Sequence, residues 1–259
     1  MIVVTGATGN IGRPLVAALE SAGEEVRAVS RRGPWPGDLS DAASLRPAFE
    51  GASAVFLLLP PDFRGPLEPV LNQAAGARVV LLSSQGVGTG RHPSFFEDAV
   101  RASGLQWTIL RPGGFASNAL QWAESVRSSR TLSAPFGDVA LPLIDPADIA
   151  SVAAAVLVDS SHAGLAYELT GPALISPRDQ AAAIGTAVGE PVRFVSQTRS
   201  EAFSSFVSFM PPEVAEATLD ILGSPTPAEQ RVSPDVSRVL GRPPRPFADW
   251  AERFAGAFK

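Results

Sequence analysis

The chain has 259 residues, 45% of them hydrophobic, which is enough to bury a sizeable core in one large domain or in a main domain with an appendage. Its formal charge of -5 and pI near 5.1 argue against a nucleic-acid partner, because nucleic-acid binders usually present a basic patch. The absence of cysteine excludes disulfides, thiolate nucleophiles and cysteine metal sites.

Apolar, β-branched runs alternate with helical patterns through the first two thirds of the chain. Strands are predicted at 2–5, 25–29, 54–59, 78–83, 106–110 and 165–170. Helices are predicted between them at 11–22, 41–50, 66–75, 93–103 and 115–129. Strands that are apolar throughout and separated by helices form parallel sheets covered on both faces. The pattern therefore predicts an α/β fold with a Rossmann-type doubly wound parallel sheet.

The pattern changes after about Asp145. A proline followed by apolar residues at helical spacing predicts a helix there, and further helical segments are predicted at 177–188, at 199–223 and in the tail after GRPPRPF. We divide the chain into a main domain at 1–160 and a smaller, mainly helical C-terminal lobe at 161–259. That lobe is expected to return at least one strand to the sheet.

The opening VVTGATGNIGRPL places Gly6, Gly9 and Gly12 between the first strand and the first helix. Glycine permits a tight turn and close approach to a pyrophosphate, and the helix N-terminus adds N–H donors and partial positive charge. A tight turn without a ligand is the alternative. We predict that residues 1–160 form an NAD(P)-binding domain. Three further residues of this loop are predicted to contact the cofactor, namely Thr8, Asn10 and Ile11.

The second strand ends in Ser30, Arg31 and Arg32 and carries no acidic residue. An acid at this position usually holds the ribose 2′-hydroxyl of NAD, whereas arginine accommodates a 2′-phosphate. The sequence therefore favours NADP(H) over NAD(H). The alternative is that the arginines are solvated loop charges.

Two further segments are expected at the cofactor. Asp38 and Leu39 follow the second strand, where Asp38 could accept from the adenine amino group or cap the next helix. Leu58, Leu59 and Pro60 end the third predicted strand at the crevice edge, where the backbone would touch the cofactor.

Several motifs together resemble one family. TGATGNIG, the arginines after VRAVS, GDLSDAASL, LLSSQGVG, SGLQWTILRPGGFASN and AYELTGP occur in order and resemble the NmrA-like branch of the atypical short-chain dehydrogenase/reductase superfamily. The resemblance implies a Rossmann domain that binds NADP(H) and a C-terminal lobe that closes over substrate. It implies either a reductase of quinones or other acceptors, or an NADP(H)-sensing regulatory protein that catalyses nothing.

The tyrosine and lysine that catalyse carbonyl reduction in typical members of the superfamily are missing. Ser84 matches the family's serine, but Thr89 and Pro93 stand where the tyrosine and lysine would lie. The only tyrosine, Tyr167, has no lysine four residues later, because Lys259 is the only lysine. Tyrosine-assisted carbonyl reduction is therefore excluded. Hydride transfer to a quinone or another electrophilic conjugated acceptor stays open.

The remaining polar residues near Ser84 are candidates for the chemistry. Ser84 and Gln85 could hydrogen-bond a substrate oxygen or could merely terminate the strand. His92 is a candidate proton donor or an exposed loop residue. Glu97 is expected to be structural. With His92 and His162 as the only histidines, no metal site is expected.

Residues after two strands complete the predicted site. Ser83, Pro112 and Gly113 are placed near the cofactor. For Pro112 and Gly113 this is what the resemblance implies, because related proteins approach the nicotinamide just after this strand. Four side chains are predicted to contact the substrate, namely Gln85, Phe115, Asn118 and Phe206. Phe206 and its aromatic neighbours recur at helical spacing, so the alternative for them is a packed core.

The sequence thus predicts an NADPH-dependent oxidoreductase of a quinone-like or conjugated aromatic molecule, with Ser84 and His92 as catalytic candidates and secondary metabolism as its setting. The alternatives are the NADP(H) sensor and a non-redox tailoring enzyme. The N-terminus lacks a basic and apolar leader, and no stretch reaches the roughly 18 apolar residues of a membrane span. We expect a cytoplasmic protein with a small-molecule partner and leave a homodimer open.

Overall fold

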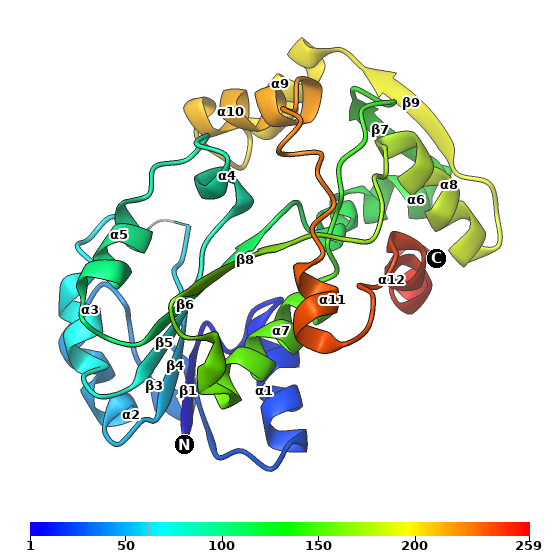
Figure 1. Cartoon of the computed structure of the whole chain (residues 1–259). Coiled ribbons are helices and arrows are strands. Elements are labelled where there is room, and N and C mark those ends of the chain that lie inside the picture. Colours follow the sequence, from blue (N-terminus) through cyan, green and yellow to red (C-terminus); the bar gives the residue numbers. More distant parts are fainter. Residues whose placement is uncertain (62) are drawn as a thin grey trace. The chain divides into compact units, whose positions relative to one another are not determined.

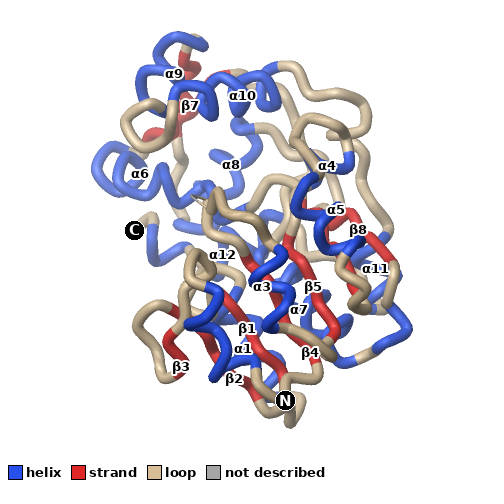
Figure 2. The backbone as a smooth tube through the Cα atoms, turned by 90° about the vertical axis from the view of Figure 1, so that its left-hand side faces the viewer, coloured by secondary structure: helices blue, strands red, loops and turns tan. Residues whose placement is uncertain are grey.

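The computed structural model describes residues 1–61 and 63–259 (Figures 1 and 2). The chain forms two compact units of three segments each. Unit 1 comprises Met1–Pro112, Pro146–Leu169 and Pro234–Pro243, and unit 2 comprises Gly113–Asp145, Thr170–Ser233 and Pro244–Lys259. The division at residue 160 drawn from the sequence stays a prediction.

The centre of unit 1 is a seven-stranded sheet in which neighbouring strands pair in parallel. In spatial order the strands are β3 (Trp35–Pro36), β2 (Val26–Ser30), β1 (Ile2–Thr5), β4 (Ala54–Leu58), β5 (Arg78–Leu82), β6 (Trp107–Pro112) and β8 (Leu165–Leu169). From β1 the chain adds β2 and β3 on one side of the sheet, and then adds β4 and the later strands on the other side of β1. Ligands of doubly wound sheets bind at such a switch point, here between β1 and β4. The predicted Rossmann-type fold is confirmed.

Helices cover both faces of this sheet (Figure 1). They are α1 (Gly12–Ser21), α7 (Pro146–Val158) and α11 (Asp235–Leu240) on one face, and α2 (Arg46–Phe49), α3 (Glu68–Gln73) and α5 (Phe95–Ala102) on the other. Successive side chains of a strand point to opposite faces of the sheet. Val55 packs toward the face that α3 and α5 cover, and its neighbour Phe56 is as fully buried, so both faces are closed to solvent there. This two-sided burial explains why the strands are apolar throughout. Figure 2 shows β1 beside β2 in the same unit.

Short elements complete unit 1. The predicted helix at 41–50 is two elements, the 3-10 helix η1 (Ala42–Leu45) and α2, with Pro47 in the first turn of α2. Proline lacks the N–H that a continuous helix would use, so the helical hydrogen-bond pattern restarts there. The unit also contains α4 (Gln85–Gly88) and the 3-10 helix η3 (Ser160–His162).

Unit 2 is mainly helical and carries a two-stranded parallel sheet of β7 (Thr131–Pro135) and β9 (Arg193–Gln197), which the sequence did not predict. Its helices are η2 (Ala116–Trp122), α6 (Ala123–Ser129), α8 (Pro177–Val188), α9 (Arg199–Phe206), α10 (Pro212–Gly223), α12 (Phe247–Arg253) and η4 (Ala255–Ala257). Trp250 of α12 is fully buried in a core that includes Ile184 of α8.

Two predicted helices of this unit are wrong in part. The segment 199–223 is interrupted, because Pro211 and Pro212 end the pattern after α9 and start α10. The segment 115–129 begins as the 3-10 helix η2 and becomes α-helical only at Ala123. In contrast, the helix predicted at 177–188 is confirmed, with a capping box between Ser176 and Asp179.

None of the helices within 1–61 and 63–259 has the length and apolar character that crossing a membrane requires.

Candidate functional site

The glycine-rich loop forms a tight turn between β1 and α1. Gly6 has φ +64, and a Cβ on Gly12 would lie 2.2 Å from the Gly6 carbonyl oxygen, so both positions need glycine. The Gly9 N–H donates to the Gly6 carbonyl at 3.0 Å, while Thr8, Gly9 and Asn10 are exposed.

The first turn of α1 has no side-chain cap, since its N-cap residue is Ile11. Its N–H groups therefore suit a pyrophosphate, whose negative charge the helix N-terminus favours. The uncapped N–H donors and the exposed residues of this loop fit the predicted cofactor. Ile11 and Gly12 are buried, so they shape the turn.

A hydroxyl that the sequence analysis missed joins the two strands of the switch point. Thr5 Oγ1 donates to the Phe56 carbonyl at 3.0 Å and accepts from the Leu58 N–H at 2.9 Å. It therefore fastens the carboxyl ends of β1 and β4 to each other at the switch point. The only sequence signal was a polar residue at the end of an apolar strand.

The ends of β2 and β4 lie on the same carboxyl edge of the sheet. Arg31 and Arg32 are exposed, and neither makes a hydrogen bond or ion pair with another residue of the described chain. Leu58 ends β4, and a Cβ on Gly6 would lie 3.2 Å from its side chain. Leu59 and Pro60 follow it and are half-buried.

The alternative role for Asp38, that it caps the next helix, is wrong. Asp41 is the N-cap of η1 and accepts from the Ala43 N–H, whereas the Asp38 carboxylate accepts from the Ser40 N–H at 2.8 Å. Leu39 packs into the core of unit 1, which leaves only its backbone for a cofactor. Contact between Asp38 and adenine stays a prediction.

The carboxyl end of β5 carries Ser83 and Ser84 in sequence. Ser84 is the N-cap of α4, and its Oγ accepts from the Gly86 N–H at 3.1 Å. The same Oγ lies 3.3 Å from Nδ1 of His92. The structure thus supports strand termination by Ser84 and also brings the two catalytic candidates together.

Gly86 allows this contact. A Cβ on Gly86 would lie 2.5 Å from His92 Nδ1, and the His92 N–H donates to the Gly86 carbonyl at 2.9 Å. His92 is exposed to solvent, while the Gln85 side chain is buried and its Nε2 has no hydrogen-bond partner within the described residues.

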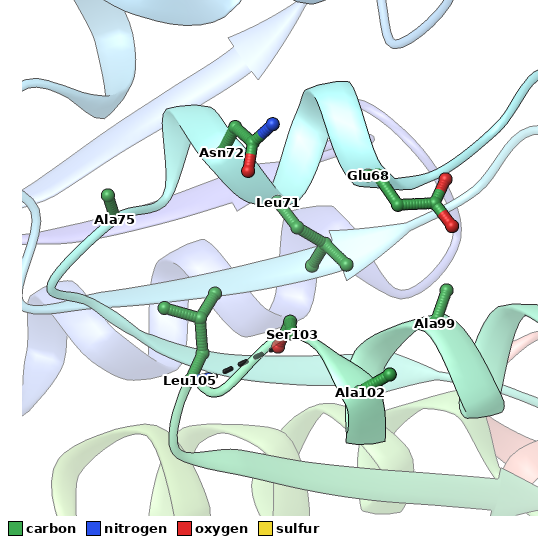
Figure 3. Close-up of a pocket in the computed structure, with 8 residues that line it drawn as sticks. All are labelled: Glu68, Leu71, Asn72, Ala75, Ala99, Ala102, Ser103 and Leu105. Carbon is green, nitrogen blue, oxygen red and sulfur yellow. Dashed lines mark hydrogen bonds between the residues drawn. The ribbon is translucent and has the colours of Figure 1, made fainter.

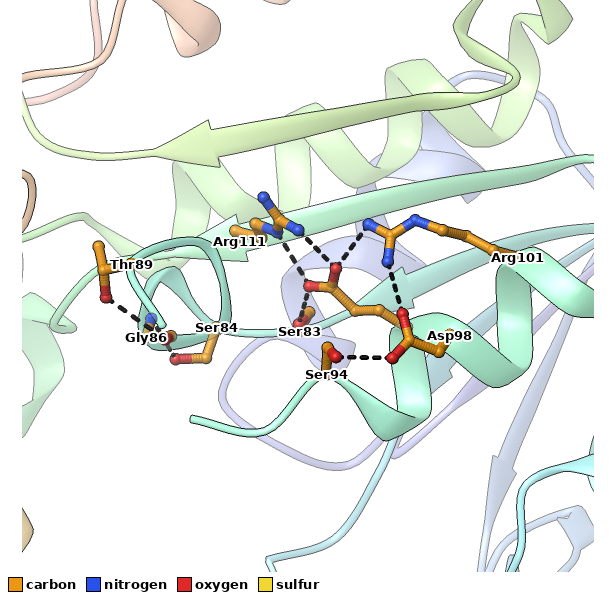
Figure 4. Close-up of polar contacts among 9 residues, drawn as sticks. Ser83, Ser84, Gly86, Thr89, Ser94, Asp98, Arg101 and Arg111 are labelled. Carbon is orange, nitrogen blue, oxygen red and sulfur yellow. Dashed lines mark hydrogen bonds and ion pairs between the residues drawn. The ribbon is translucent and has the colours of Figure 1, made fainter. Parts of the chain in front are cut away.

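A buried carboxylate lies behind the two serines. Glu97 of α5 is 1% exposed and accepts hydrogen bonds from Ser83 Oγ at 2.6 Å, from Arg111 Nε at 2.9 Å and from Arg101 Nη2 at 2.8 Å. Figure 4 shows Arg101 and Arg111 pointing toward the same carboxylate, with Ser83 beneath it. Burial by itself raises the pKa of Glu97, but the hydrogen bonds from Arg111, Ser83 and Arg101 outweigh it and hold that pKa below its ordinary value.

The predicted substrate residues other than Gln85 belong to unit 2, as does Gly113, whereas Pro112 ends β6 in unit 1. Phe115 precedes η2 and is half-buried, and Asn118 is exposed. Phe206 ends α9, with its ring centroid 5.8 Å from that of Phe209. The roles of these residues toward cofactor and substrate stay predictions.

A cavity of about 200 Å³ lies between α3 and α5 and contains none of the predicted site residues. Leu71 points from α3 toward α5, and the lining includes Ala75 and Leu105 (Figure 3). These residues precede β5 and β6, so the cavity lies toward the amino ends of the strands, whereas open sheets bind ligands at the carboxyl ends.

Comparison with known proteins agrees with the geometry of the glycine loop. Residues 6–160 match the family model described as NAD(P)H-binding. The chain is 38% identical to a (4-alkanoyl-5-oxo-2,5-dihydrofuran-3-yl)methyl phosphate reductase of Streptomyces griseus, covering 100% of this chain and 99% of that protein. It is 32% identical to an NAD(P)H azoreductase of Xenophilus azovorans, again over 100% of this chain and 99% of the relative.

Solved structures share the fold. The NADPH-dependent quinone oxidoreductase QOR2 of Escherichia coli, complexed with NADPH, superposes with a TM-score of 0.82 at 23% identity and covers 98% of this chain and 99% of that one. The triphenylmethane reductase of Citrobacter sp. complexed with NADP(H) gives a TM-score of 0.75 at 20% identity, with 98% and 99% covered.

The chain therefore belongs to the NAD(P)H-binding family, and the resemblance to NmrA-like atypical short-chain dehydrogenase/reductases is confirmed. It is an NAD(P)H-dependent oxidoreductase, which decides against the sensor and the non-redox alternatives.

Proposed function

We propose that this member of the NAD(P)H-binding family uses NADPH to reduce an electrophilic conjugated small molecule, of the quinone or conjugated enone kind, with Ser84 and His92 supplying the proton. The observation that carries the proposal is the 3.3 Å contact between Ser84 Oγ and His92 Nδ1 at the carboxyl end of β5. β5 neighbours β4, so this pair lies on the second half of the sheet beyond the switch point, where the second half of a dinucleotide lies in this fold.

The cofactor would be held by the residues of the first half of the sheet. The loop from Gly6 to Gly12 would receive the pyrophosphate, and Arg31 or Arg32 would pair with the 2′-phosphate, because guanidinium matches phosphate geometry. Both arginines are exposed at the end of β2, which supports a preference for NADPH over NADH. Bound NADPH supplies a hydride, which is two electrons and one hydrogen.

Ser84 and His92 would complete the reduction with one proton. Hydride addition to a conjugated carbon places negative charge on the acceptor's oxygen, and a hydrogen-bond donor lowers the barrier by stabilising that charge. Ser84 Oγ already accepts from the Gly86 N–H, so its own hydrogen is directed to the His92 ring or to the acceptor. Because His92 is exposed, it can recover its proton from water.

No tyrosine–lysine pair assists this reaction. The only tyrosine, Tyr167, lies in β8, where its hydroxyl is 2.6 Å from His162 Nδ1, and Lys259 is the last residue. Without that general acid the acceptor must be electrophilic by itself. The named substrate of the Streptomyces griseus relative has this character, since its oxo-dihydrofuran ring places a carbon–carbon double bond beside two carbonyl groups. That likeness supports a conjugated acceptor here.

The test is consumption of NADPH with a panel of quinones, conjugated enones, alkanoyl dihydrofuranones and azo dyes. We expect turnover with at least one conjugated class, and a fall in kcat of about 10²-fold or more in Ser84→Ala and His92→Ala, the lower end of general acid catalysis. Asp98→Asn, on the same edge but 62% exposed, serves as the control. No turnover with any class, or full activity in both variants, would contradict the proposal.

The setting in secondary metabolism and the homodimer stay predictions, as does the substrate role of Phe115, Asn118 and Phe206.

A further inference from the structure

We propose that Glu97 is a positioning residue that fixes the hydroxyl of Ser83 as a hydrogen-bond acceptor toward the carboxamide N–H of the nicotinamide. The proposal rests on the proposed function, because it requires the nicotinamide half of the cofactor at the end of β5. It concerns the orientation of the cofactor, which the Ser84 and His92 pair does not provide.

The four donors around Glu97 leave its carboxylate no free position. Oε1 accepts from Ser83 Oγ and from Arg111 Nε, and Oε2 accepts from Arg111 Nη2 at 2.6 Å and from Arg101 Nη2 at 2.8 Å. A carboxylate offers about four acceptor sites, and the two oxygens here each receive two donors. The arrangement holds Glu97 as an ionised group, which has no proton to give.

The direction of the Ser83 hydrogen follows from this. Since Glu97 can only accept, the Ser83 hydroxyl must donate to it, and the 2.6 Å distance is that of a hydrogen bond to a charged acceptor. Ser83 Oγ can then only accept a further hydrogen bond from a neighbouring group, through its lone pair. The Ser83 backbone is also fixed, because its N–H donates to the Leu110 carbonyl of β6 at 2.7 Å.

The next serine has the opposite polarity. Ser84 Oγ accepts from the Gly86 N–H, which leaves its hydrogen for donation. Two adjacent hydroxyls at one strand end therefore offer an acceptor and a donor. The dihydronicotinamide carboxamide carries N–H donors, and the reduced acceptor carries a negatively charged oxygen, so Ser83 suits the cofactor and Ser84 the substrate.

Arg111 connects the carboxylate to the turn that carries Ser84. It lies on β6, and a Cβ on Gly88 of α4 would be 3.1 Å from Arg111 Nη1. The guanidinium thus lies against α4 with one edge while its other edge binds Glu97. The arginine that pairs with Glu97 thus also lies against α4, the turn that Ser84 caps.

The test compares binding of two reduced dinucleotides in the absence of any acceptor. One is NADPH, and the other is its 3-acetylpyridine analogue, in which a methyl ketone replaces the carboxamide and no N–H remains. Dissociation constants are measured by nucleotide fluorescence for the wild type, Ser83→Ala, Glu97→Gln, the double variant and the control Asp98→Asn. Asp98 lies beside Glu97 on α5 and also pairs with Arg101, but it is exposed.

The wild type and Asp98→Asn should bind NADPH about two- to tenfold more tightly than the analogue, the value of one hydrogen bond. Ser83→Ala should lose this preference. Glu97→Gln should lose or invert it, because the amide can donate to Ser83 and release the hydroxyl to donate to a ketone. The double variant should resemble Ser83→Ala, since Glu97 acts through Ser83.

An unchanged preference in Ser83→Ala would overturn the inference even if reductase activity is found. Absence of NADPH binding by the wild type would overturn both the inference and the proposed function. Failure of the acceptor panel alone would leave the binding result standing. Should Glu97→Gln fail to fold, Ser83→Ala decides the question.

Discussion

The contact between Ser84 and His92 depends on the absence of a side chain at Gly86. In Gly86→Ala the new methyl group would lie 2.5 Å from His92 Nδ1, 2.8 Å from Cε1 and 2.9 Å from Cγ. Ordinary van der Waals contact begins at 3.4 Å, so the ring must retreat by roughly 0.9 Å, the difference between 3.4 and 2.5. The Ser84 contact, already 3.3 Å long and made by the same Nδ1 atom, would then be lost.

Gly86→Ala should lower activity and leave the free energy of unfolding nearly unchanged. The ring is the exposed end of a side chain and can move into solvent, and Gly86 lies in the short helix α4, where alanine is favoured over glycine by up to about 1 kcal/mol. We therefore expect a change in unfolding free energy within about 1 kcal/mol, a few degrees in Tm. Activity should fall by up to the 10²–10⁴-fold that a general acid contributes.

The assay is steady-state reduction of the best conjugated acceptor, beside thermal unfolding and an NADPH binding titration. Gly256→Ala is the matched control, because within the described residues nothing other than its chain neighbours and the backbone of its own helix lies within 4 Å of a Cβ at Gly256. We expect Gly86→Ala to lower kcat, to leave NADPH affinity unchanged and to match the control in Tm. A kcat within twofold of the wild type would refute the role of the contact, and a large fall in Tm would refute the claim that the ring moves freely.

Three further predictions follow from the geometry. Gly12→Ala should abolish NADPH binding and lower Tm, because the added methyl group would lie 2.2 Å from the Gly6 carbonyl oxygen. That oxygen belongs to the backbone, so it cannot move aside as the end of a side chain could. Unchanged affinity for NADPH would contradict this prediction. Arg31→Ala combined with Arg32→Ala should reduce the NADPH-over-NADH preference by about tenfold or more, the value of one charge-assisted hydrogen bond, and an unchanged ratio of kcat/KM would refute the phosphate assignment. Because the folded pKa of Glu97 lies below its ordinary 4.5, its stabilisation is present above that pH and is lost as the pH falls through the folded value. Denaturant unfolding should therefore show that the free energy of unfolding falls more in the wild type than in Glu97→Gln when the pH is lowered from 7 to below 4.5. An equal fall in both proteins would show that ionised Glu97 does not stabilise the fold.

The parallel sheet and the tight glycine turn after β1 could be predicted, because each depends on a local pattern of residues. Apolar runs such as 54–58 are needed wherever both faces of a strand are buried, and Gly6 and Gly12 are needed wherever a backbone turns this tightly. Elements whose formation depends on distant partners were missed. β7 and β9 pair across more than fifty intervening residues, and α4 is a single turn capped by Ser84.

The sequence by itself determined the family, its NAD(P)H cofactor and the loss of the tyrosine–lysine pair, because these depend on which residues are present and on their local spacing. Only the tertiary structure decided that His92 returns to Ser84 across Gly86, and that Glu97 is the acceptor for Ser83, Arg101 and Arg111. Nothing in the sequence distinguishes Glu97 from an ordinary exposed acidic residue in the first turn of a helix. Folding brings α5 against β5 and β6 and removes that carboxylate from water, and a carboxylate in such a place must be paired.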